Sequence, residues 1–353
     1  MPKHTSDNLR IKRKHLVWLK DAKGLSQSSI DKAAASIAIY DRWLKGKDYR
    51  AFHSERARAF KRHLAGLRNE RTGAPLSAAT INGVLRDVMK FFDWMADQPG
   101  YKSRISRADI AYLTPDRKSE QARRSTLWKP HPSPEQVIHL LSAMPVETVI
   151  QRRDRALIAF LFLTGSREGA AITVRLRHVD LTNKCVQFDG RSVETKFGKS
   201  FTTSFFPFGD SIEQILRDWI RELRQDYLFS DTDPLFPKTR VDVGPSRRFE
   251  AVGIAREPWA GPSSAARIFK QAFVNAGLPT FSPHRVRDTI AELAKHHCRT
   301  PEDYKAWSQN MGHDDVMTTF NSYGSVSPGR QVELMTRFRQ CGPLLDENDV
   351  IEQ

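Results

Sequence analysis

Cysteine is scarce in this sequence. The chain of 353 residues has three cysteines, Cys185, Cys298 and Cys341, which are odd in number and unpatterned in spacing. A disulfide scaffold or a structural zinc site needs paired or regularly spaced cysteines, so both are excluded. The run His296-His297-Cys298 has no second ligand pair at a suitable spacing, which favours an ordinary helix end. We therefore expect no metal and no cofactor.

Long apolar runs are missing as well. The run from Ala156 to Leu163 is far too short to span a bilayer. The polar N-terminus lacks the apolar core of a secretory signal, and no internal repeat is evident. We therefore expect a cytoplasmic protein without a membrane partner.

Acidic residues are too few to balance the basic ones. Lys and Arg number 56 against 41 Asp and Glu, a net charge of +15, and the isoelectric point is near 9.8. Up to Ser125 the chain has 27 basic and 13 acidic residues, whereas the remainder has 29 and 28. Such a basic segment predicts salt-sensitive binding to a polyanion, because each neutralised phosphate releases counterions. Charge alone would also fit a ribosomal or RNA-binding arm.

The length exceeds that of a usual single domain and indicates two or three units. Apolar residues at helical spacing, such as Ile81, Leu85 and Val88, predict a helical bundle in the first third. A charged stretch with Pro115 and Pro130 has no sustained apolar period, as expected of a linker. The predicted segments are a basic arm or short helix (1–25), a helical DNA-binding unit (26–112), a linker (113–131), a second globular unit (132–330) and a C-terminal tail (331–353).

Local signals place the elements of the second unit. Ser133-Pro134-Glu135-Gln136 matches a capping box that starts a helix. The apolar run 156–163 is typical of a buried helix, and the β-branched and aromatic texture of 179–208 predicts a three-stranded antiparallel sheet. The Pro- and Gly-rich stretch 234–262 is expected to be a loop. Further helices are expected at 265–276, at 284–297 and from Gln331 onward, so the predicted fold class is mainly α with a small antiparallel β-sheet.

Several side chains have the chemistry for attack on a phosphodiester. Arg167 and Arg287 can offer paired donors to phosphate oxygens at any working pH. The Tyr323 hydroxyl, with an ordinary pKa near ~10, becomes a nucleophile once neighbours lower the cost of losing its proton. His284 can exchange protons at neutral pH as a general base. Each of these residues, taken alone, also fits a role without catalysis. His284 and Arg287, for example, are three positions apart and would share one solvated face of a helix.

The motifs around these residues resemble the active site of the tyrosine recombinase (phage integrase) family. The resemblance extends over about residues 26–330 and implies an N-terminal core-binding, SAM-like helical domain ahead of a mixed α+β catalytic domain. It also implies that Lys196, on a β-hairpin, is the general acid in preference to Lys199, and that His313 holds the phosphate. The matching segments are Thr164-Gly165-Ser166-Arg167, Thr195-Lys196-Phe197-Gly198-Lys199-Ser200, Ser282-Pro283-His284-Arg285-Val286-Arg287, Met311-Gly312-His313 and Tyr323.

The chain departs from the family pattern near the first arginine. The family usually has an acidic residue three positions after that arginine, where it braces the guanidinium, and this chain has Ala170 there. Glu168 directly follows Arg167 and either takes over the bracing or faces solvent. Asp288 stands where the family often has His after the second arginine, at a position without a catalytic role.

The resemblance implies a site-specific recombinase that cuts and rejoins DNA through a 3′-phosphotyrosine, integrating or excising a mobile element. Its partners would be double-stranded DNA recombination sites, three further copies of itself in a homotetramer, and accessory DNA-bending or directionality factors. DNA binding would place it at the nucleoid within the cytoplasm. Two alternatives remain open: a type IB topoisomerase, and a DNA-binding regulator or inactive integrase that binds sites without cutting.

Overall fold

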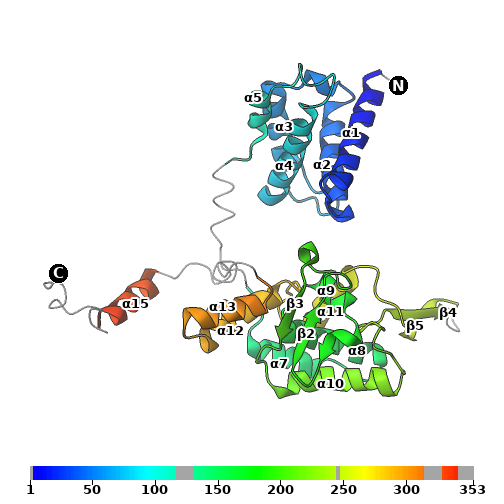
Figure 1. Ribbon diagram of the computed structural model, residues 1–353, viewed down its shortest axis with the longest axis vertical. Coiled ribbons are helices and arrows are strands. Elements are labelled where there is room, and N and C mark those ends of the chain that lie inside the picture. Colours follow the sequence, from blue (N-terminus) through cyan, green and yellow to red (C-terminus); the bar gives the residue numbers. More distant parts are fainter. Residues whose placement is uncertain (1–2, 117–129, 244–246, 314–327, 341–353) are drawn as a thin grey trace. The chain divides into compact units, whose positions relative to one another are not determined.

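The computed structural model describes residues 3–116, 130–243, 247–313 and 328–340 (Figure 1). The chain divides into two units, Met1–Ser125 and Thr126–Gln353. Most of the predicted linker, 117–129, lies outside the described residues.

The N-terminal unit is a bundle of helices. Its longer elements are α1 (Lys3–Asp21), α2 (Gln27–Leu44), α3 (Ser54–Gly66) and α4 (Ala78–Met95), followed by α5 (Arg107–Ile110); the single turns are η1 (Tyr49–Ala51) and η2 (Ala111–Leu113). Aromatic rings meet edge to face in its core, where Tyr40 lies 4.8 Å from Phe60 and 5.2 Å from Phe92 between ring centroids. Such pairs add about 0.5–1.5 kcal/mol each beyond their buried area. The helices predicted from the apolar stripes are therefore present.

Helix α1 belongs to this bundle. Its Ile11 and Leu19 are buried, and its His15 is only 1% exposed. The His15 ring lies 5.0 Å from the Phe91 ring and 4.9 Å from the Trp94 ring, both on α4. Of the two possibilities for residues 1–25, an arm or a short helix, residues 3–21 form a helix, and one face of this helix packs on the core of the bundle.

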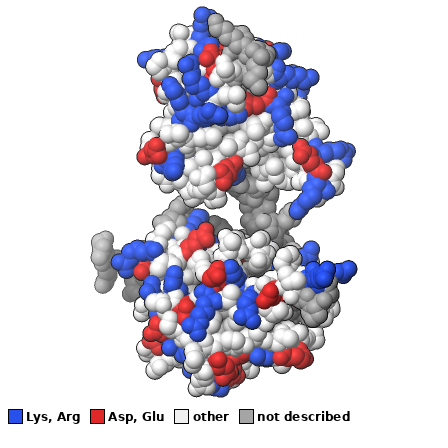
Figure 2. Space-filling model, turned by 90° about the vertical axis from the view of Figure 1, so that its right-hand side faces the viewer, with Lys and Arg blue, Asp and Glu red and all other residues white. Residues whose placement is uncertain are grey.

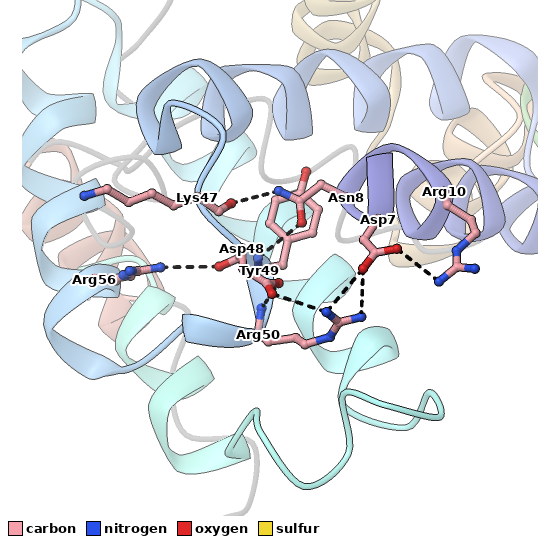
Figure 3. A network of polar contacts seen from close by, with 8 residues as sticks. All are labelled: Asp7, Asn8, Arg10, Lys47, Asp48, Tyr49, Arg50 and Arg56. Carbon is pink, nitrogen blue, oxygen red and sulfur yellow. Dashed lines mark hydrogen bonds and ion pairs between the residues drawn. The ribbon is translucent and has the colours of Figure 1, made fainter. Parts of the chain in front are cut away.

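Polar contacts fix the N-terminal end of α1 to the connection between α2 and α3 (Figure 3). The Asn8 side chain donates to the Lys47 carbonyl at 2.8 Å and accepts from the Tyr49 amide at 3.3 Å. Asp7 pairs with Arg50 at 3.2 Å. A side-chain amide that satisfies two backbone groups restricts both the position and the rotation of the helix.

The second unit is built around one buried helix. Its helices are α7 (Pro134–Ala143), α8 (Val149–Thr164), α9 (Glu168–Thr173), α10 (Asp210–Gln225), α11 (Ser263–Asn275), α12 (Arg285–His297), α13 (Pro301–Asn310) and α15 (Pro328–Gln340). Every residue of α8 from Ala156 to Leu163 is buried, as its all-round apolar sequence predicts. The capping box at Ser133 and Gln136 is present with both of its hydrogen bonds.

The predicted three-stranded sheet is confirmed. Strands β1 (Val179–Asp180), β2 (Cys185–Phe188) and β3 (Phe201–Ser204) are antiparallel in the order β1-β2-β3. The register pairs Val179 with Val186, and Val186 with Thr203. The side chains of Val186 and Phe188 are buried on one face, so the sheet packs that face on the core.

The stretch 234–262 is not the loop that was expected. It contains β4 (Thr239–Val243) and β5 (Phe249–Ile254), an antiparallel pair that projects from the unit in Figure 1. Val241 and Val243 alternate with polar neighbours, which is the period of a strand. Most of the Pro and Gly residues that predicted a loop precede β4 or follow β5, whereas Gly244 and Pro245 stand between the strands in the sequence and Gly253 is in β5. The composition of the whole stretch therefore hid the alternation within each short strand.

The C-terminal helix predicted from Gln331 is also present, as α15, and its Val332 and Met335 are exposed. Residues 341–353 of the predicted tail lie outside the described residues. No helix in the described ranges is long and apolar enough to cross a membrane.

Candidate active site

Arg287 lies at the centre of the site. It is in the first turn of α12, and only 6% of it is exposed. Its guanidinium donates to the carbonyls of Gly165 and, at 2.8 Å, Met311, and to Nε2 of His313. Since a guanidinium has no acceptor, the imidazole Nε2 must accept this bond. Burial, and secondly the charge of Arg167, lowers the pKa of Arg287 to about 10, so it remains charged at neutral pH.

Arg167 is placed by a sharp turn between two helices. Helix α8 ends at Gly165, which has a φ of +59°, and Arg167 is the N-cap residue of α9. A Cβ atom on Gly165 would lie 2.9 Å from Cδ1 of Ile290, so the turn requires glycine for both conformation and space. The side chain of Arg167 is partly exposed at the surface of the site.

Lys196 lies between β2 and β3, as predicted, in the single turn η4 (Lys196–Gly198). The loop is held closed by backbone contact: a Cβ atom on Gly190 would lie 1.9 Å from the Gly198 carbonyl oxygen. The Gly190 amide also donates to Oγ of Ser200 at 2.9 Å. The side chain of Lys196 is exposed, so a ligand at the surface can reach it.

One small pocket joins these segments. Its volume is ≈ 20 Å³, a little more than a water molecule needs. The described residues that line it come from the α8–α9 turn, the β2–β3 loop, α12 and the end of α13: Thr164, Gly165, Ser166, Arg167, Ala170, Glu194, Thr195, Lys196, Phe201, Arg287 and Met311. Three of the predicted cationic residues, Arg167, Lys196 and Arg287, therefore meet although the sequence separates them widely.

The two candidate histidines come from different segments, the start of α12 and the segment directly after α13. His284 is the N-cap residue of α12 and is exposed. Desolvation of its ring is the main cause that lowers the pKa of His284, and Asp288 opposes the effect. A lowered pKa keeps the imidazole neutral at physiological pH, as a proton acceptor must be. His313 is joined to the site through its bond from Arg287.

Tyr323 lies outside the described residues, so the structure does not place it relative to the other five positions. The segment that precedes Tyr323 in the sequence includes Gly312, whose backbone has a φ of +73°. A Cβ atom on Gly312 would lie 2.8 Å from Cε2 of Phe201, a residue of β3. Contact with the sheet thus holds His313 beside Arg287.

Sequence reasoning missed two polar residues of the pocket. Oγ of Ser166 is buried without a hydrogen-bond partner among the described residues. Glu194 brings a carboxylate to the pocket from a position two residues before Lys196. Ser166 stands within the matching segment 164–167 and Glu194 directly precedes the segment 195–200, but neither motif gives them a role, because both owe their place to the turns that hold Arg167 and Lys196.

The N-terminal unit has a basic surface. In Figure 2, Lys and Arg predominate over Asp and Glu on the visible face of this unit, whereas both signs are interspersed on the second unit. A groove of ≈ 1080 Å³ is lined by Trp43, by the basic residues Arg42, Lys45, Lys47 and Arg68, and by Glu70, which pairs with Arg42 at 3.1 Å. Cationic side chains around an aromatic ring are typical of nucleic-acid surfaces.

Comparison with known proteins agrees with this geometry. Residues 133–330 match the phage integrase family. Tyrosine recombinase XerD of Ralstonia nicotianae is 25% identical over 305 residues, which cover 86% of this chain and 85% of XerD. XerD of Pseudomonas aeruginosa is 26% identical over 279 residues, 74% of this chain and 84% of that protein.

Solved structures share the fold. A lambda integrase dimer bound to a COC′ core site has a TM-score of 0.62 at 14% identity and covers 89% of this chain and 94% of its own. XerH recombinase bound to a palindromic difH substrate has a TM-score of 0.59 at 15% identity, over 91% of this chain and 82% of its own. At these identities the likeness establishes the architecture, mainly helical with a small antiparallel sheet.

Proposed function

This chain belongs to the phage integrase family, and we propose that it cleaves and rejoins DNA through a covalent bond between Tyr323 and a 3′-phosphate. It is a site-specific tyrosine recombinase, as its relatives are. The observation that carries the assignment of residues is the single pocket in which Arg167, Lys196 and Arg287 meet.

The pocket suits the transition state of phosphoryl transfer. Negative charge builds on the non-bridging oxygens, and fixed cations stabilise it there. Arg287 is already oriented by two backbone carbonyls, so its guanidinium needs little reorganisation, and Arg167 stands across the same pocket. We assign His313 to the phosphate as well, with the Arg287 bond holding its ring in place.

Each proton in the proposed step has a residue to take or supply it. The Tyr323 oxygen forms a bond to phosphorus while the bond from phosphorus to the 5′-oxygen breaks. The Tyr323 proton passes to neutral His284, and Lys196 protonates the departing 5′-oxygen. The phosphotyrosine conserves the energy of the broken bond, so an incoming 5′-hydroxyl can reverse the step without ATP.

We extend the proposal to the assembly. One solved relative is a lambda integrase tetramer bound to a Holliday junction. By analogy, four copies of this chain would hold two duplexes and exchange strands through such a junction. The basic N-terminal unit, including α1, would bind the DNA of the recombination site. Accessory DNA-bending or directionality factors would select between integration and excision of a mobile element. A protein that acts on DNA in this way would work at the nucleoid, in the cytoplasm.

The test is trapping of the covalent intermediate. Full-length protein and its Tyr323→Phe variant are incubated with nicked suicide duplexes taken from the DNA flanking the gene, without divalent metal. An adduct that survives denaturation is expected with the wild type only. A salt-sensitive mobility shift with no adduct would instead support the non-cutting DNA-binder, and native mass of the DNA complex separates a tetramer from a monomeric topoisomerase.

A further inference from the structure

Glu194 is the one carboxylate among the described residues that line the active-site pocket. We propose that Glu194 is a positioning residue of the active site, whose carboxylate orients Arg167 toward the phosphate. The proposal rests on the function proposed above and concerns a residue that the motifs of the sequence do not indicate.

The backbone of Glu194 is tied to the end of α9. Its amide donates to Oγ1 of Thr173 at 2.9 Å. The Thr173 hydroxyl itself donates to the carbonyls of Gly169 and Ala170, each at 3.0 Å. The β2–β3 loop and α9 are thus joined at Thr173, the last residue of α9, so the backbone of Glu194 is held beside the helix.

The side chain of Glu194 then runs back along α9 toward Arg167. A Cβ atom on Gly169 would lie 3.8 Å from Oε2 and from Cδ of Glu194, so the carboxylate rests against Gly169. Ala170 also lines the pocket and leaves room there. Two small residues, Gly169 and Ala170, therefore make the space into which Glu194 enters from another element.

The charges explain why a carboxylate is needed at this place. Arg167 and Arg287 bring two like charges to one pocket, where burial first and the charge of Arg167 second lower the pKa of Arg287, and Lys196 adds a third cation. No ion pair joins Glu194 to Arg167 within the described ranges, so Glu194 acts through its field across the pocket. DNA covering the exposed carboxylate would exclude water and strengthen that field.

Glu168 is the rival for this role, and its surroundings differ. Burial lowers the pKa of His284, and the charge of Glu168 opposes this effect slightly. Glu168 is absent from the described residues that line the pocket. The acidic residue missing at position 170 is therefore replaced from the β2–β3 loop, and the neighbour of Arg167 in the sequence does not replace it.

The experiment measures single-turnover cleavage of the suicide duplex by full-length protein, with the Kd for the same DNA measured in parallel. Glu194→Gln should slow cleavage about tenfold or more, the effect of losing one transition-state interaction, while the Kd changes less than about threefold. Glu194→Asp should retain part of the rate, because it keeps the charge on a shorter side chain. Adding Ala170→Glu to Glu194→Gln should restore cleavage, because it supplies a carboxylate to the same pocket.

Asp189→Asn is the matched control. Asp189 is in the same β2–β3 connection, but its side chain pairs with Arg191 at 3.0 Å, so its loss should leave cleavage unchanged. The proposal is overturned if Glu194→Gln cleaves as fast as the wild type, if Glu194→Asp is as slow as Glu194→Gln, or if only Glu168→Gln slows the reaction. An absence of adduct from the wild type itself would overturn the proposed function and this inference together.

Discussion

Acid should lower the free energy of unfolding of the N-terminal unit, and one histidine should account for part of that loss. His15 is buried in an aromatic site of α1 and α4, and its Nδ1 has no hydrogen-bond partner among the described residues. Desolvation lowers the pKa of His15 from 6.5 to about 4. A charged imidazole is therefore disfavoured in the folded unit and accepted readily in the unfolded chain.

The sign and the size follow from linkage. Because the folded pKa is lower, the unfolded state binds more protons once the pH falls below 6.5, and the contribution to stability is lost between pH 6.5 and about 4. At about 1.36 kcal/mol per pKa unit, the full loss is about 3 kcal/mol. About 2 kcal/mol of this should already be gone at pH 5.

The assay is urea unfolding of the full-length chain at pH 7 and pH 5, followed by pulsed hydrogen exchange at one fixed pH. Peptides from α1 and α4 then report the N-terminal unit separately from the second unit. His15→Phe keeps an aromatic ring but cannot titrate, so the difference between wild type and variant isolates this histidine from the other acidic and basic groups. Equal losses of stability in both proteins between pH 7 and pH 5 would refute the reasoning.

Three further outcomes are expected. Gly165→Ala should lower the free energy of unfolding of the second unit by about 2–3 kcal/mol in urea, because it adds the close contact with Ile290 to the strain of a positive φ. Gly24→Ala, at the same φ of +59° but with open space around it, should cost only the conformational part. The acid limb of the cleavage rate against pH should have its midpoint below 6.5, since the pKa of His284 is lowered; a midpoint above 6.5 would exclude His284 as the base. Arg42→Ala should reduce the slope of log affinity against log salt by about one, and an unchanged slope would remove this residue from the DNA-binding surface.

Some of the fold could be predicted because its signals are local. The capping box at Ser133 and the apolar run of α8 each lie within a few consecutive residues, and the physics of a helix start or a buried helix acts over that range. The three-stranded sheet likewise follows from short β-branched and aromatic segments separated by turns. The hairpin β4–β5 was missed because its alternation is short and lies between prolines and glycines.

The active-site motifs were also determined by the sequence, through the order of their residue types. The sequence named Arg167, Lys196, His284, Arg287, His313 and Tyr323 as candidates, and their catalytic roles stay predictions, as does the position of Tyr323 in the site. Family membership confirms the kind of protein that these motifs predicted.

Only the tertiary structure decided which of these side chains share a pocket and what else enters it. The bond from Arg287 to the Gly165 carbonyl spans 122 positions of the chain, and it exists because α8, α12 and the β2–β3 loop pack on one core. The environments of Glu194 and His15 also could not be predicted from the sequence. Nothing local marks either residue, because the space beside Gly169 and the aromatic site on α4 are created by contacts between distant segments.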